Sequence, residues 1–253
     1  MGTTERHRQI TDAVREAGEL SVADLADLAG ASEMTIRRDL EALSEQGVLE
    51  RYRGGARSLL LRGVEPPFAL RAQEGRDAKR RLAATVAGLL SDGESVVLDS
   101  GTTCLEVARA VGDRRLTVMP LSMHAANALT AASRVRLLLP GGEPRPGELA
   151  LTGPLAQASL AALRFDTAVI GCCGLNVAAG LTAHDLADAA IKRAAIASAR
   201  RVIAVTEASK FTRTALAYVV PASALHAVVT EATAPEDEVA ALTAAGVSVR
   251  FCD

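Results

Sequence analysis

Residues 20–40 constrain the fold of this chain most, because they predict two short helices joined by a glycine turn. The first helix, Leu20–Ala29, opens with Ser21-x-x-Asp24, a pattern similar to a capping box. Gly30-Ala31 forms the turn, and Ser32 is the expected N-cap of the second helix. The apolar positions of that helix are Met34, Ile36, Leu40 and Leu43. Two such helices predict a helix-turn-helix, whose second helix enters the DNA major groove.

The polar side of the second helix carries the residues expected to meet base edges. Ser32 and Thr35 lie in its first turn, and Arg37 and Arg38 follow on the side away from the apolar face. An isolated pair of arginines is often only a solvated helix surface. Within a helix-turn-helix pattern, however, we interpret these four residues as DNA contacts.

A second DNA-binding element is expected downstream. Residues 48–53 predict a strand, Gly54-Gly55 a turn and residues 56–60 a return strand, which together form the wing of a winged helix. Glycines at the tip permit positive φ and a close approach of the backbone to phosphate. The cationic residues placed toward phosphates or the minor groove are Arg51, Arg53 and Arg57.

The net charge does not by itself indicate DNA binding. The whole chain has a formal charge of −2, and residues 1–57 contain 8 Arg against 11 Asp and Glu. The binding surface must therefore be a local arginine cluster, with the acidic residues Asp39, Glu41, Glu45 and Glu50 facing elsewhere. Few phosphate contacts in one copy predict weak, salt-sensitive binding. We therefore expect a homodimer that binds two half-sites, with a homotetramer left open.

Residues 6–57 resemble the N-terminal domain of the DeoR family of bacterial transcriptional regulators. The similarity lies in two motifs, Thr35-Ile36-Arg37-Arg38-Asp39-Leu40 and Arg51-Tyr52-Arg53-Gly54-Gly55-Ala56. The resemblance implies a winged helix-turn-helix that binds an operator in double-stranded DNA. It also implies, as a family tendency, a repressor of carbohydrate metabolism genes.

From Asp77 onward, helices alternate with short apolar strands, which is typical of an α/β domain with a largely parallel sheet. The predicted helices are 77–90, 103–111, 154–163, 185–199 and 235–245. The predicted strands are 95–98, 116–119, 135–139, 167–170, 202–205, 227–229 and 248–251. We expect a DNA-binding domain (1–60), a linker (61–76) centred on Pro66-Pro67, and an α/β effector-sensing domain (77–253). Phe68 and Leu70 are the expected anchors of the linker on the second domain.

Ligands of such sheets bind at the carboxyl ends of the strands. Here Asp99-Ser100-Gly101-Thr102-Thr103 follows a strand and opens a helix, so its amides and hydroxyls predict a phosphate cradle. A structural helix cap explains that loop alone equally well. Gly141-Gly142, Gly171 and Ser209-Lys210 follow later strands. Lys210 supplies a cation for an anionic ligand unless it is an ordinary surface lysine, whereas Lys192 is interpreted as structural or solvated.

These turns together resemble the sensor domain of the DeoR family, whose fold is similar to that of ribose-5-phosphate isomerase and glucosamine-6-phosphate deaminase. The resemblance implies that a phosphorylated sugar or related metabolite binds here and changes the affinity for DNA. In it, Gly142 and Gly171 allow close approach and Lys210 supplies charge. The implied effector-binding residues are Asp99, Ser100, Gly101, Thr102, Thr103, Ser122, Gly141, Gly142, Gly171 and Lys210.

The sequence departs from the family pattern at two places. Pro120-Leu121-Ser122 stands where the family has Thr-Asn-Ser, and Leu175-Asn176 stands where the related deaminases have catalytic acids. His184-Asp185 is more typical of a helix cap than of a catalytic dyad. Because acid–base turnover needs positioned titratable groups, we predict a binding protein and no enzyme. The alternative is a sugar-phosphate isomerase or deaminase with a DNA-binding appendage.

The four cysteines are Cys104, Cys172, Cys173 and Cys252, and none has Cys-x-x-Cys spacing. Neither a metal site nor a disulfide framework is therefore predicted, and no cofactor is expected. A redox sensor built on the adjacent Cys172-Cys173 is a third interpretation, opposed by the strain of a vicinal disulfide. No apolar run approaches the length of a membrane span and no leader is evident, so we expect a cytoplasmic protein without a membrane partner.

Overall fold

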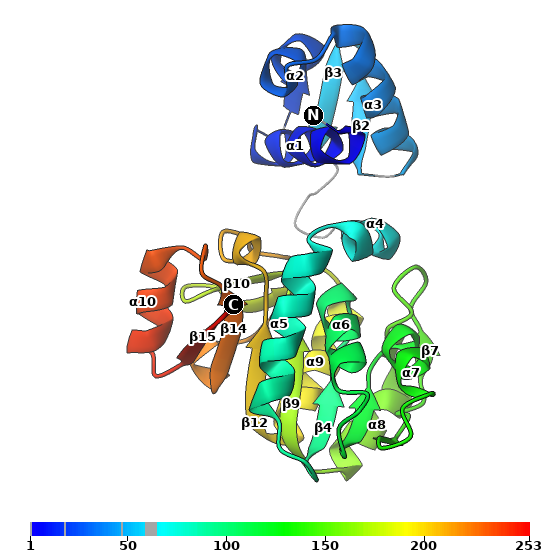
Figure 1. The fold of residues 1–253 in the computed structure, drawn as a ribbon, viewed down its shortest axis with the longest axis vertical. Helices are drawn as coiled ribbons and strands as arrows, with labels where there is room; N and C mark the ends of the chain where they lie inside the picture. The colour runs from blue at the N-terminus through cyan, green and yellow to red at the C-terminus, as the bar shows by residue number, and fades with distance from the viewer. Residues whose placement is uncertain (1, 18, 47, 59–64) are drawn as a thin grey trace. The chain divides into compact units, whose positions relative to one another are not determined.

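The computed structural model describes residues 2–17, 19–46, 48–58 and 65–253, and the chain divides into two compact units, Met1–Pro67 and Phe68–Asp253 (Figure 1). Some predicted boundaries, at Gly18, at Gly47 and within residues 59–64, lie outside the described residues. Among the residues that the structure describes, every helix is too short or too polar to cross a bilayer.

The smaller unit is a winged helix-turn-helix, as predicted. Its elements are α1 (Thr3–Ala17), β1 (Glu19–Ser21), α2 (Val22–Ala29), α3 (Glu33–Glu45), β2 (Leu49–Tyr52) and β3 (Gly55–Ser58). Ile36, Leu40 and Leu43 of α3 are buried, but Met34 is 61% exposed, so its assignment to the apolar face was wrong. Met34 lies two residues from Ile36, which places it about 200° around the helix.

The first helix of the helix-turn-helix begins later than predicted. Glu19–Ser21 forms strand β1, which pairs with β3 so that Leu20 lies opposite Ala56, and α2 starts only at Val22. The capping box is confirmed: the Ser21 hydroxyl accepts from the Asp24 amide, and the Asp24 carboxylate accepts from the Ser21 amide. Leu20 is a strand residue because its backbone pairs with β3 of the wing. The local sequence pattern gives no sign of this distant partner.

The two glycines of the wing serve different purposes. Gly54 has φ +106°, as predicted for the tip. Gly55 does not have positive φ. It is needed because a Cβ there would lie 2.3 Å from the Leu20 carbonyl oxygen and 2.6 Å from the Tyr52 hydroxyl oxygen. Close packing of β1 and Tyr52 on the hairpin therefore explains the second glycine.

The larger unit is built on one parallel sheet of seven strands, in the order β15-β14-β12-β9-β4-β5-β6. These strands are β4 (Ser95–Leu98), β5 (Thr117–Pro120), β6 (Arg136–Leu137), β9 (Phe165–Gly171), β12 (Ala199–Val205), β14 (Ala227–Glu231) and β15 (Ser248–Cys252). The longer helices are α5 (Arg76–Leu89), α6 (Thr102–Ala110), α8 (Pro154–Ala162), α9 (Leu186–Ala197) and α10 (Glu236–Ala244). The predicted α/β class is confirmed, and each predicted strand and helix is present with slightly different ends.

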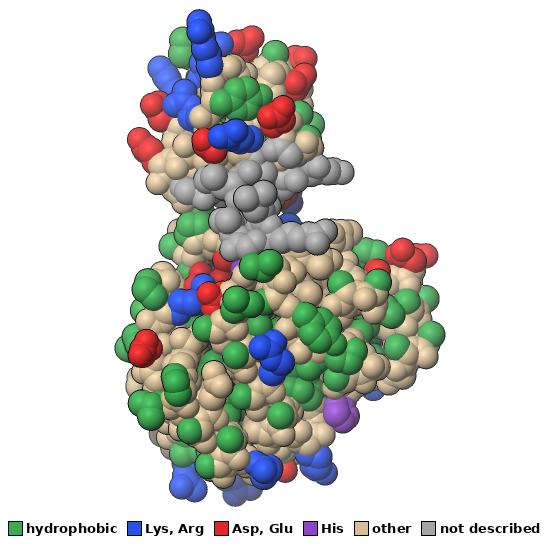
Figure 2. Space-filling model, turned by 180° about the vertical axis from the view of Figure 1, so that it is seen from behind, with side chains coloured by type: hydrophobic (Ala, Val, Ile, Leu, Met, Phe, Trp, Pro, Cys, Tyr) green, Lys and Arg blue, Asp and Glu red, His purple; other side chains and the backbone are tan. Residues whose placement is uncertain are grey.

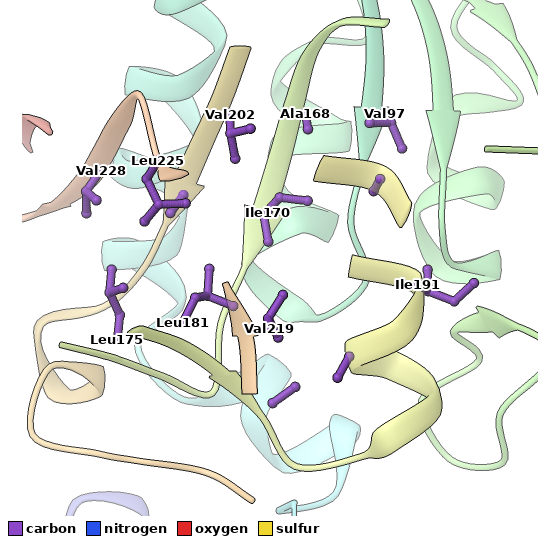
Figure 3. Close-up of a cluster of buried hydrophobic side chains, with 14 of the residues drawn as sticks. Val97, Ala168, Ile170, Leu175, Leu181, Ile191, Val202, Val219, Leu225 and Val228 are labelled. Atoms are coloured by element: carbon purple, nitrogen blue, oxygen red, sulfur yellow. The ribbon is translucent and has the colours of Figure 1, made fainter. Parts of the chain in front are cut away.

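Successive residues of a strand point to opposite faces of the sheet, which gives this unit two hydrophobic clusters. Val97, Ala168 and Ile170 pack on one face with side chains of α8 and α9 (Figure 3). Val96 and Val169 pack on the other face with side chains of α5 and α6. Because both faces are covered, the central strands read as continuous apolar runs.

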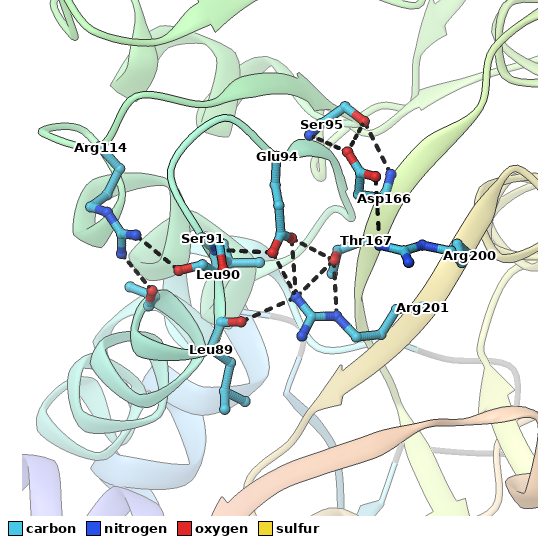
Figure 4. A network of polar contacts seen from close by, with 11 residues as sticks. Leu89, Leu90, Ser91, Glu94, Ser95, Arg114, Asp166, Thr167, Arg200 and Arg201 are labelled. Atoms are coloured by element: carbon cyan, nitrogen blue, oxygen red, sulfur yellow. Dashed lines mark hydrogen bonds and ion pairs between the residues drawn. The ribbon is translucent and has the colours of Figure 1, made fainter.

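A polar network closes the amino ends of the central strands (Figure 4). Arg201 Nη2 donates to Glu94 Oε2 at 3.0 Å, and Thr167 Oγ1 donates to the same oxygen at 2.8 Å. Asp166 Oδ2 accepts from the amide and the hydroxyl of Ser95 at 2.9 and 2.8 Å. The polar side chains of this edge are thus bonded to one another, whereas the carboxyl edge holds the loops predicted to bind a ligand.

Several elements of the larger unit were not predicted. They are α4 (Phe68–Gln73), α7 (Met123–Leu129), the hairpin of β7 (Glu143–Pro144) and β8 (Leu151–Thr152), and the antiparallel sheet of β10 (Gly174–Asn176), β11 (Gly180–Ala183) and β13 (Ala217–Val220). Helix α4 lies within the predicted linker, which is therefore helical over Phe68–Gln73. Phe68 is 9% exposed and stacks on His124, so its role as an anchor is confirmed.

Candidate functional site

The start of α3 positions its polar side chains through a cap. Ser32 is extended, with φ −69° and ψ 149°, and its Oγ accepts from the Thr35 amide at 3.2 Å. The two hydroxyl oxygens, Ser32 Oγ and Thr35 Oγ1, lie 2.9 Å apart. The cap satisfies one of the amides that a helix start leaves unpaired. It also fixes Thr35 on the first turn, where a recognition helix meets base edges.

Arg37 and Arg38 are both exposed on α3, as expected of DNA contacts, but their surroundings differ. Arg37 Nη2 donates to Glu33 Oε2 at 2.6 Å, one turn earlier. Arg38 has no ion-pair partner among the described residues. The Arg37 guanidinium is thus engaged by the protein itself, whereas no acid that the structure describes competes for Arg38.

The acidic residue that follows Arg38 in the sequence, Asp39, is turned inward. Asp39 is 6% exposed, and its carboxylate accepts from Arg6 Nε at 2.5 Å and lies 3.0 Å from His7 Nε2, both on α1. Burial alone raises the pKa of Asp39, but the hydrogen bonds with Arg6 and His7 outweigh it and hold the pKa below its ordinary value. Asp39 thus joins α3 to α1, and its carboxylate is turned into the fold, as predicted for an acid that does not share the surface of Arg37 and Arg38.

Two of the three wing arginines are paired with acids, so the expectation that Glu41 and Glu50 face away from the arginine cluster was wrong. Arg57 donates twice to the Glu50 carboxylate, at 2.8 and 2.7 Å, and Arg51 Nη1 lies 3.5 Å from Glu41 Oε1. Arg53, between β2 and β3, has no acidic partner among the described residues. Arg53 is therefore the wing cation best placed to meet a phosphate.

In the larger unit, α6 begins at the carboxyl end of β4 without a side-chain cap. Its N-cap is Gly101, with φ +95° and ψ 170°, a conformation essentially restricted to glycine. A Cβ at Gly101 would find no atom within 4 Å, so the space beside it is open. Thr102 is buried and Thr103 half-buried in the first turn, which contains no acidic residue. The amides and dipole of this helix start are suited to an anion.

A buried charge cluster supports the loop before α6. Lys192 Nζ donates to Asp99 Oδ2 and lies 3.5 Å from Asp188 Oδ2. The same Asp99 oxygen accepts from the Gly171 amide at 2.9 Å, and Ser100 Oγ donates to Asp188 Oδ1 at 3.3 Å. The Asp99 side chain is fully buried, and its Oδ2 is engaged by Lys192 and by the Gly171 amide, whereas its Oδ1 has no hydrogen-bond partner among the described residues. Burial and these two bonds argue against the predicted contact with a ligand. Lys192 is structural, as predicted.

The cluster buries the carboxylates of Asp99 and Asp188 together with the ammonium group of Lys192. Burial, together with the nearby charge of Asp188, raises the pKa of Asp99 to about 6, although Lys192 opposes the shift. Burial disfavours the charged form of Lys192, but Asp188 and Asp99 hold its pKa well above the ordinary value. Lys192 therefore stays charged and joins α9 to the end of β4. The sequence hint for it was the Asp188–Lys192 spacing of one helical turn.

Three other predicted contacts serve the protein's own packing. Ser122 is 1% exposed and its Oγ accepts from the Ala125 amide at 3.1 Å, so it caps α7. A Cβ at Gly142 would lie 2.3 Å from the Thr152 carbonyl oxygen, so chain packing, and not ligand approach, requires this glycine. Gly171 uses its amide on Asp99. Gly141, by contrast, is exposed, with φ +71° and no atom within 4 Å of a built Cβ.

Lys210 closes the short 3-10 helix η1 (Ala208–Lys210) that follows β12. Its side chain is half-buried and has no ion-pair partner among the described residues. Burial first, and then the positive charge of Arg213, lower the pKa of Lys210, with Glu207 offsetting part of the effect. A cation in such surroundings gains from an anionic ligand.

The groups considered for other chemistry are used structurally. Asp185 caps α9, accepting from the Asp188 amide at 2.8 Å, which confirms the cap interpretation. Cys172 Sγ donates to Thr206 Oγ1 at 3.2 Å, and burial raises the pKa of Cys172, which disfavours a reactive thiolate. Within the described ranges, His, Cys, Asp and Glu side chains form no group of three or more that suits a metal ion.

Two family models match the chain where these two sites lie. The model of the DeoR-like helix-turn-helix domain covers residues 6–60, and that of the DeoR C terminal sensor domain covers residues 74–232. The chain belongs to the DeoR family of transcriptional regulators. We call its units the reader (Met1–Pro67) and the sensor (Phe68–Asp253) from here on.

Relatives of this DeoR-family chain carry the names of transcriptional regulators. The putative aga operon transcriptional repressor of Escherichia coli O157:H7 is 34% identical, with 98% of this chain and 93% of that protein covered. The glycerol-3-phosphate regulon repressor of Escherichia coli K12 is 31% identical, with 100% of both chains covered. The repressor AccR of Agrobacterium fabrum is 34% identical over 85% of this chain and 84% of that protein.

Solved structures are similar only at a low level. Ribose 5-phosphate isomerase A of Methanocaldococcus jannaschii aligns with a TM-score of 0.42 and 16% identity, covering 55% of this chain and 56% of that one. An eIF2B delta structure from Chaetomium thermophilum aligns with a TM-score of 0.41 and 18% identity, covering 57% and 52%. No statement about activity follows from similarities of this size.

Proposed function

We propose that this regulator is a repressor of carbohydrate metabolism genes that leaves its operator when a phosphorylated sugar or related metabolite binds the sensor. The names of the relatives support repression, since they are repressors of the aga operon and of the glycerol-3-phosphate regulon. In the reader, the proposed DNA contacts are Ser32, Thr35, Arg37, Arg38, Arg51, Arg53 and Arg57.

The observation that carries the effector site is the uncapped start of α6 at the carboxyl edge of the sheet. Gly101 leaves open space above the first amides, and the hydroxyls of Ser100, Thr102 and Thr103 accompany them. Gly141 and Lys210 complete the proposed site, with Lys210 as its cation. Asp99 accepts from both the Gly171 amide and Lys192 beneath the loop, and we assign neither Asp99 nor Gly171 a contact with the ligand.

Release from DNA requires that the effector favour a different arrangement of the chain. A ligand shifts an equilibrium only through its differential affinity for the two states. Two readers must fit two half-sites together, so a change in the way the readers are held is sufficient to lower operator affinity.

We propose that copies of the chain associate to pair the readers. The sensor supports this with exposed apolar side chains on neighbouring elements: Leu186 at the start of α9 is 70% exposed, and Leu216 and Tyr218 by β13 are 61% and 54% exposed. Figure 2 shows hydrophobic side chains spread over one face of the sensor. Light scattering of the purified chain should give the mass of a dimer or tetramer, and Tyr218→Lys should shift it toward the monomer.

Thermal shift with phosphorylated sugars and their unphosphorylated counterparts tests the effector site. A ligand that binds only the folded state raises the melting temperature. We expect a rise with a phosphosugar and none with its free sugar, and loss of that rise in Thr102→Ala and Lys210→Ala. Arg164→Ala, an exposed substitution after α8, is the control. A response retained in both sensor variants would refute the site.

The enzyme alternative is tested in the same preparation. The sensor lacks acids at Leu175-Asn176, and Asp185 is used as a cap. We therefore expect no turnover of ribose 5-phosphate or glucosamine 6-phosphate beyond a buffer control. Turnover lost in Lys210→Ala would favour the enzyme.

A further inference from the structure

Helix α4 is the first element of the sensor and follows Pro67, the last residue of the reader. Helix α5 follows directly and leads to the start of β4, so α5 begins at the carboxyl edge of the sheet. Helix α4 lies at that edge, packed on α6 (Figure 1). Helix α4 is therefore placed beside the proposed effector site.

A buried lysine holds α4 there. Lys79, 3% exposed, donates from Nζ to the carbonyls of Arg71 and Glu74, the latter at 2.6 Å, and so caps the end of α4. The same Nζ lies 3.7 Å from Oε1 of Glu207, the residue before η1 and its Lys210. One ammonium thus ties α4 to the turn that carries the proposed effector cation.

The first residue of α4, Phe68, is tied to the same edge. The rings of Phe68 and His124 stack with centroids 4.1 Å apart, and His124 is the second residue of α7, the helix that follows β5. Arg71 also lies on α4, and its guanidinium carbon is 5.8 Å from the Phe68 ring centroid. The guanidinium is therefore held at the edge, not in solvent.

The Arg71 side chain is paired with a carboxylate there. Arg71 Nη2 donates to Glu148 Oε2, and the two side chains are 13% and 8% exposed. Glu148 lies between β7 and β8, two residues before Ala150, which bridges Ser122. The ion pair thus links α4 to the rim of the sheet.

Three cations share this region. Besides burial, the positive charges of Arg213 and then of Arg71 act to lower the pKa of Lys210. Arg71 already holds an anionic group, the Glu148 carboxylate. Guanidinium groups form the same forked hydrogen bonds with phosphate as with carboxylate, so a phosphate can take the place of Glu148.

We propose that Arg71 is an effector-binding residue: an anionic effector at the start of α6 takes the Arg71 guanidinium from Glu148 and thereby moves α4. The inference rests on the proposed function, because it needs an anionic ligand at the α6 cradle. In this proposal, α4, the helix that follows the reader in the chain, couples effector binding to DNA affinity.

An Arg71 that exchanges Glu148 for the effector and an Arg71 that stays paired with Glu148 predict different changes in effector affinity. If Arg71 exchanges partners, Arg71→Met weakens effector binding and Glu148→Gln strengthens it, because Glu148 competes with the effector. If the pair only supports the fold, both substitutions change affinity in the same direction or leave it unchanged. The two variants together therefore decide between the models.

The test is calorimetric titration of the full chain with inorganic phosphate, glycerol 3-phosphate, glucose 6-phosphate and fructose 6-phosphate. For a probe that binds the wild type, Arg71→Met should raise Kd about tenfold, since a charge-assisted hydrogen bond is lost. Glu148→Gln should lower Kd about threefold, and Arg81→Met, an exposed arginine of α5, should leave it within about twofold. If Arg71→Met does not fold, Arg71→Lys should still bind about threefold more weakly, because the fork is lost.

The outcomes separate the two proposals. Wild-type binding with equal Kd in the Arg71 and Glu148 variants, or with shifts of the same sign, overturns the role of Arg71 and leaves the effector site standing. Absence of wild-type binding to all four probes overturns both. Hydrogen exchange provides a second readout: the probe should raise exchange over residues 68–73 in the wild type and not in Arg71→Met.

Discussion

The helices α3 and α6 both begin at a proposed binding surface, but they begin in opposite ways. Helix α3 starts with Ser32, whose hydroxyl takes the Thr35 amide, while α6 starts with Gly101 and has no side-chain cap. In α3 the Thr35 amide is already bonded, so side chains are the groups that remain for recognition. In α6 no side chain caps the first turn, so its backbone amides remain for a ligand. The reader is therefore suited to base edges and the sensor to an anion.

A buried aspartate supports each helix, again in different ways. Asp39 of the reader accepts a hydrogen bond from Arg6 and lies within hydrogen-bond distance of His7. These two partners outweigh burial, and the pKa of Asp39 lies below the ordinary value. Asp99 of the sensor shares Lys192 with Asp188, and with burial its pKa rises to about 6. In the reader, one carboxylate thus has two partners, Arg6 and His7. In the sensor, two carboxylates share the single ammonium group of Lys192.

The largest expected effect is on this sensor cluster. Lys192→Met leaves two buried carboxylates without their cation and should cost about 3–5 kcal/mol of unfolding free energy. Urea denaturation followed by circular dichroism measures it. Arg193→Met, at an exposed neighbouring position, should cost less than about 0.5 kcal/mol. Equal costs for the two would show that the cluster does not hold the α6 loop.

Next in size is the loss of base contacts in the reader. Thr35→Ala and Arg37→Ala should each lower operator affinity by about 1–3 kcal/mol and relax specificity at one position. Fluorescence anisotropy with operator and scrambled DNA measures both. Arg8→Ala on α1, where Arg8 pairs with Glu5, is the control. A uniform loss on both DNAs would mean that these side chains meet phosphates instead.

The cap of α3 should contribute less. Ser32→Ala leaves the Thr35 amide without its partner and should cost about 1 kcal/mol of stability. Ser32→Asp keeps an acceptor and should restore stability, but it brings negative charge to the DNA surface and should lower affinity. A stable Ser32→Ala chain would break the contrast drawn between α3 and α6.

Smaller still is the difference between the wing arginines. Arg53→Ala should weaken binding to all sequences and reduce the salt slope by about 1. Arg57→Ala should change the slope less, because Glu50 already pairs with Arg57. Anisotropy titrations over a range of salt concentrations compare the two. A larger change for Arg57 would mean that DNA displaces Glu50.

The smallest effect is a pH dependence of the reader. Because the pKa of Asp39 is lowered in the fold, its stabilisation is present above the unfolded value near 3.8 and is lost as the pH falls through the folded value. The difference in stability between wild type and Asp39→Asn should therefore shrink below about pH 4. The raised pKa of Asp99 has the opposite sign: its contribution falls as pH rises from 3.8 toward about 6.

The sequence by itself determined the features that depend on neighbours in the chain. Caps at Ser21, Ser32 and Asp185 were readable because a cap joins residues three apart. The sheet strands were readable because apolar runs between turns are typical of strands covered on both faces. The family motifs lay in these same local patterns.

Tertiary structure decided the features that depend on distant partners. Leu20 is a strand residue because of Ala56, Gly142 is required by Thr152, and Asp99 is buried by Lys192. Each of these contacts joins segments whose proximity follows from the packing of the sheet and not from spacing in the chain. A polar or glycine residue in a loop therefore shows where a site can lie. Burial and partner then decide whether it binds a ligand or supports the fold.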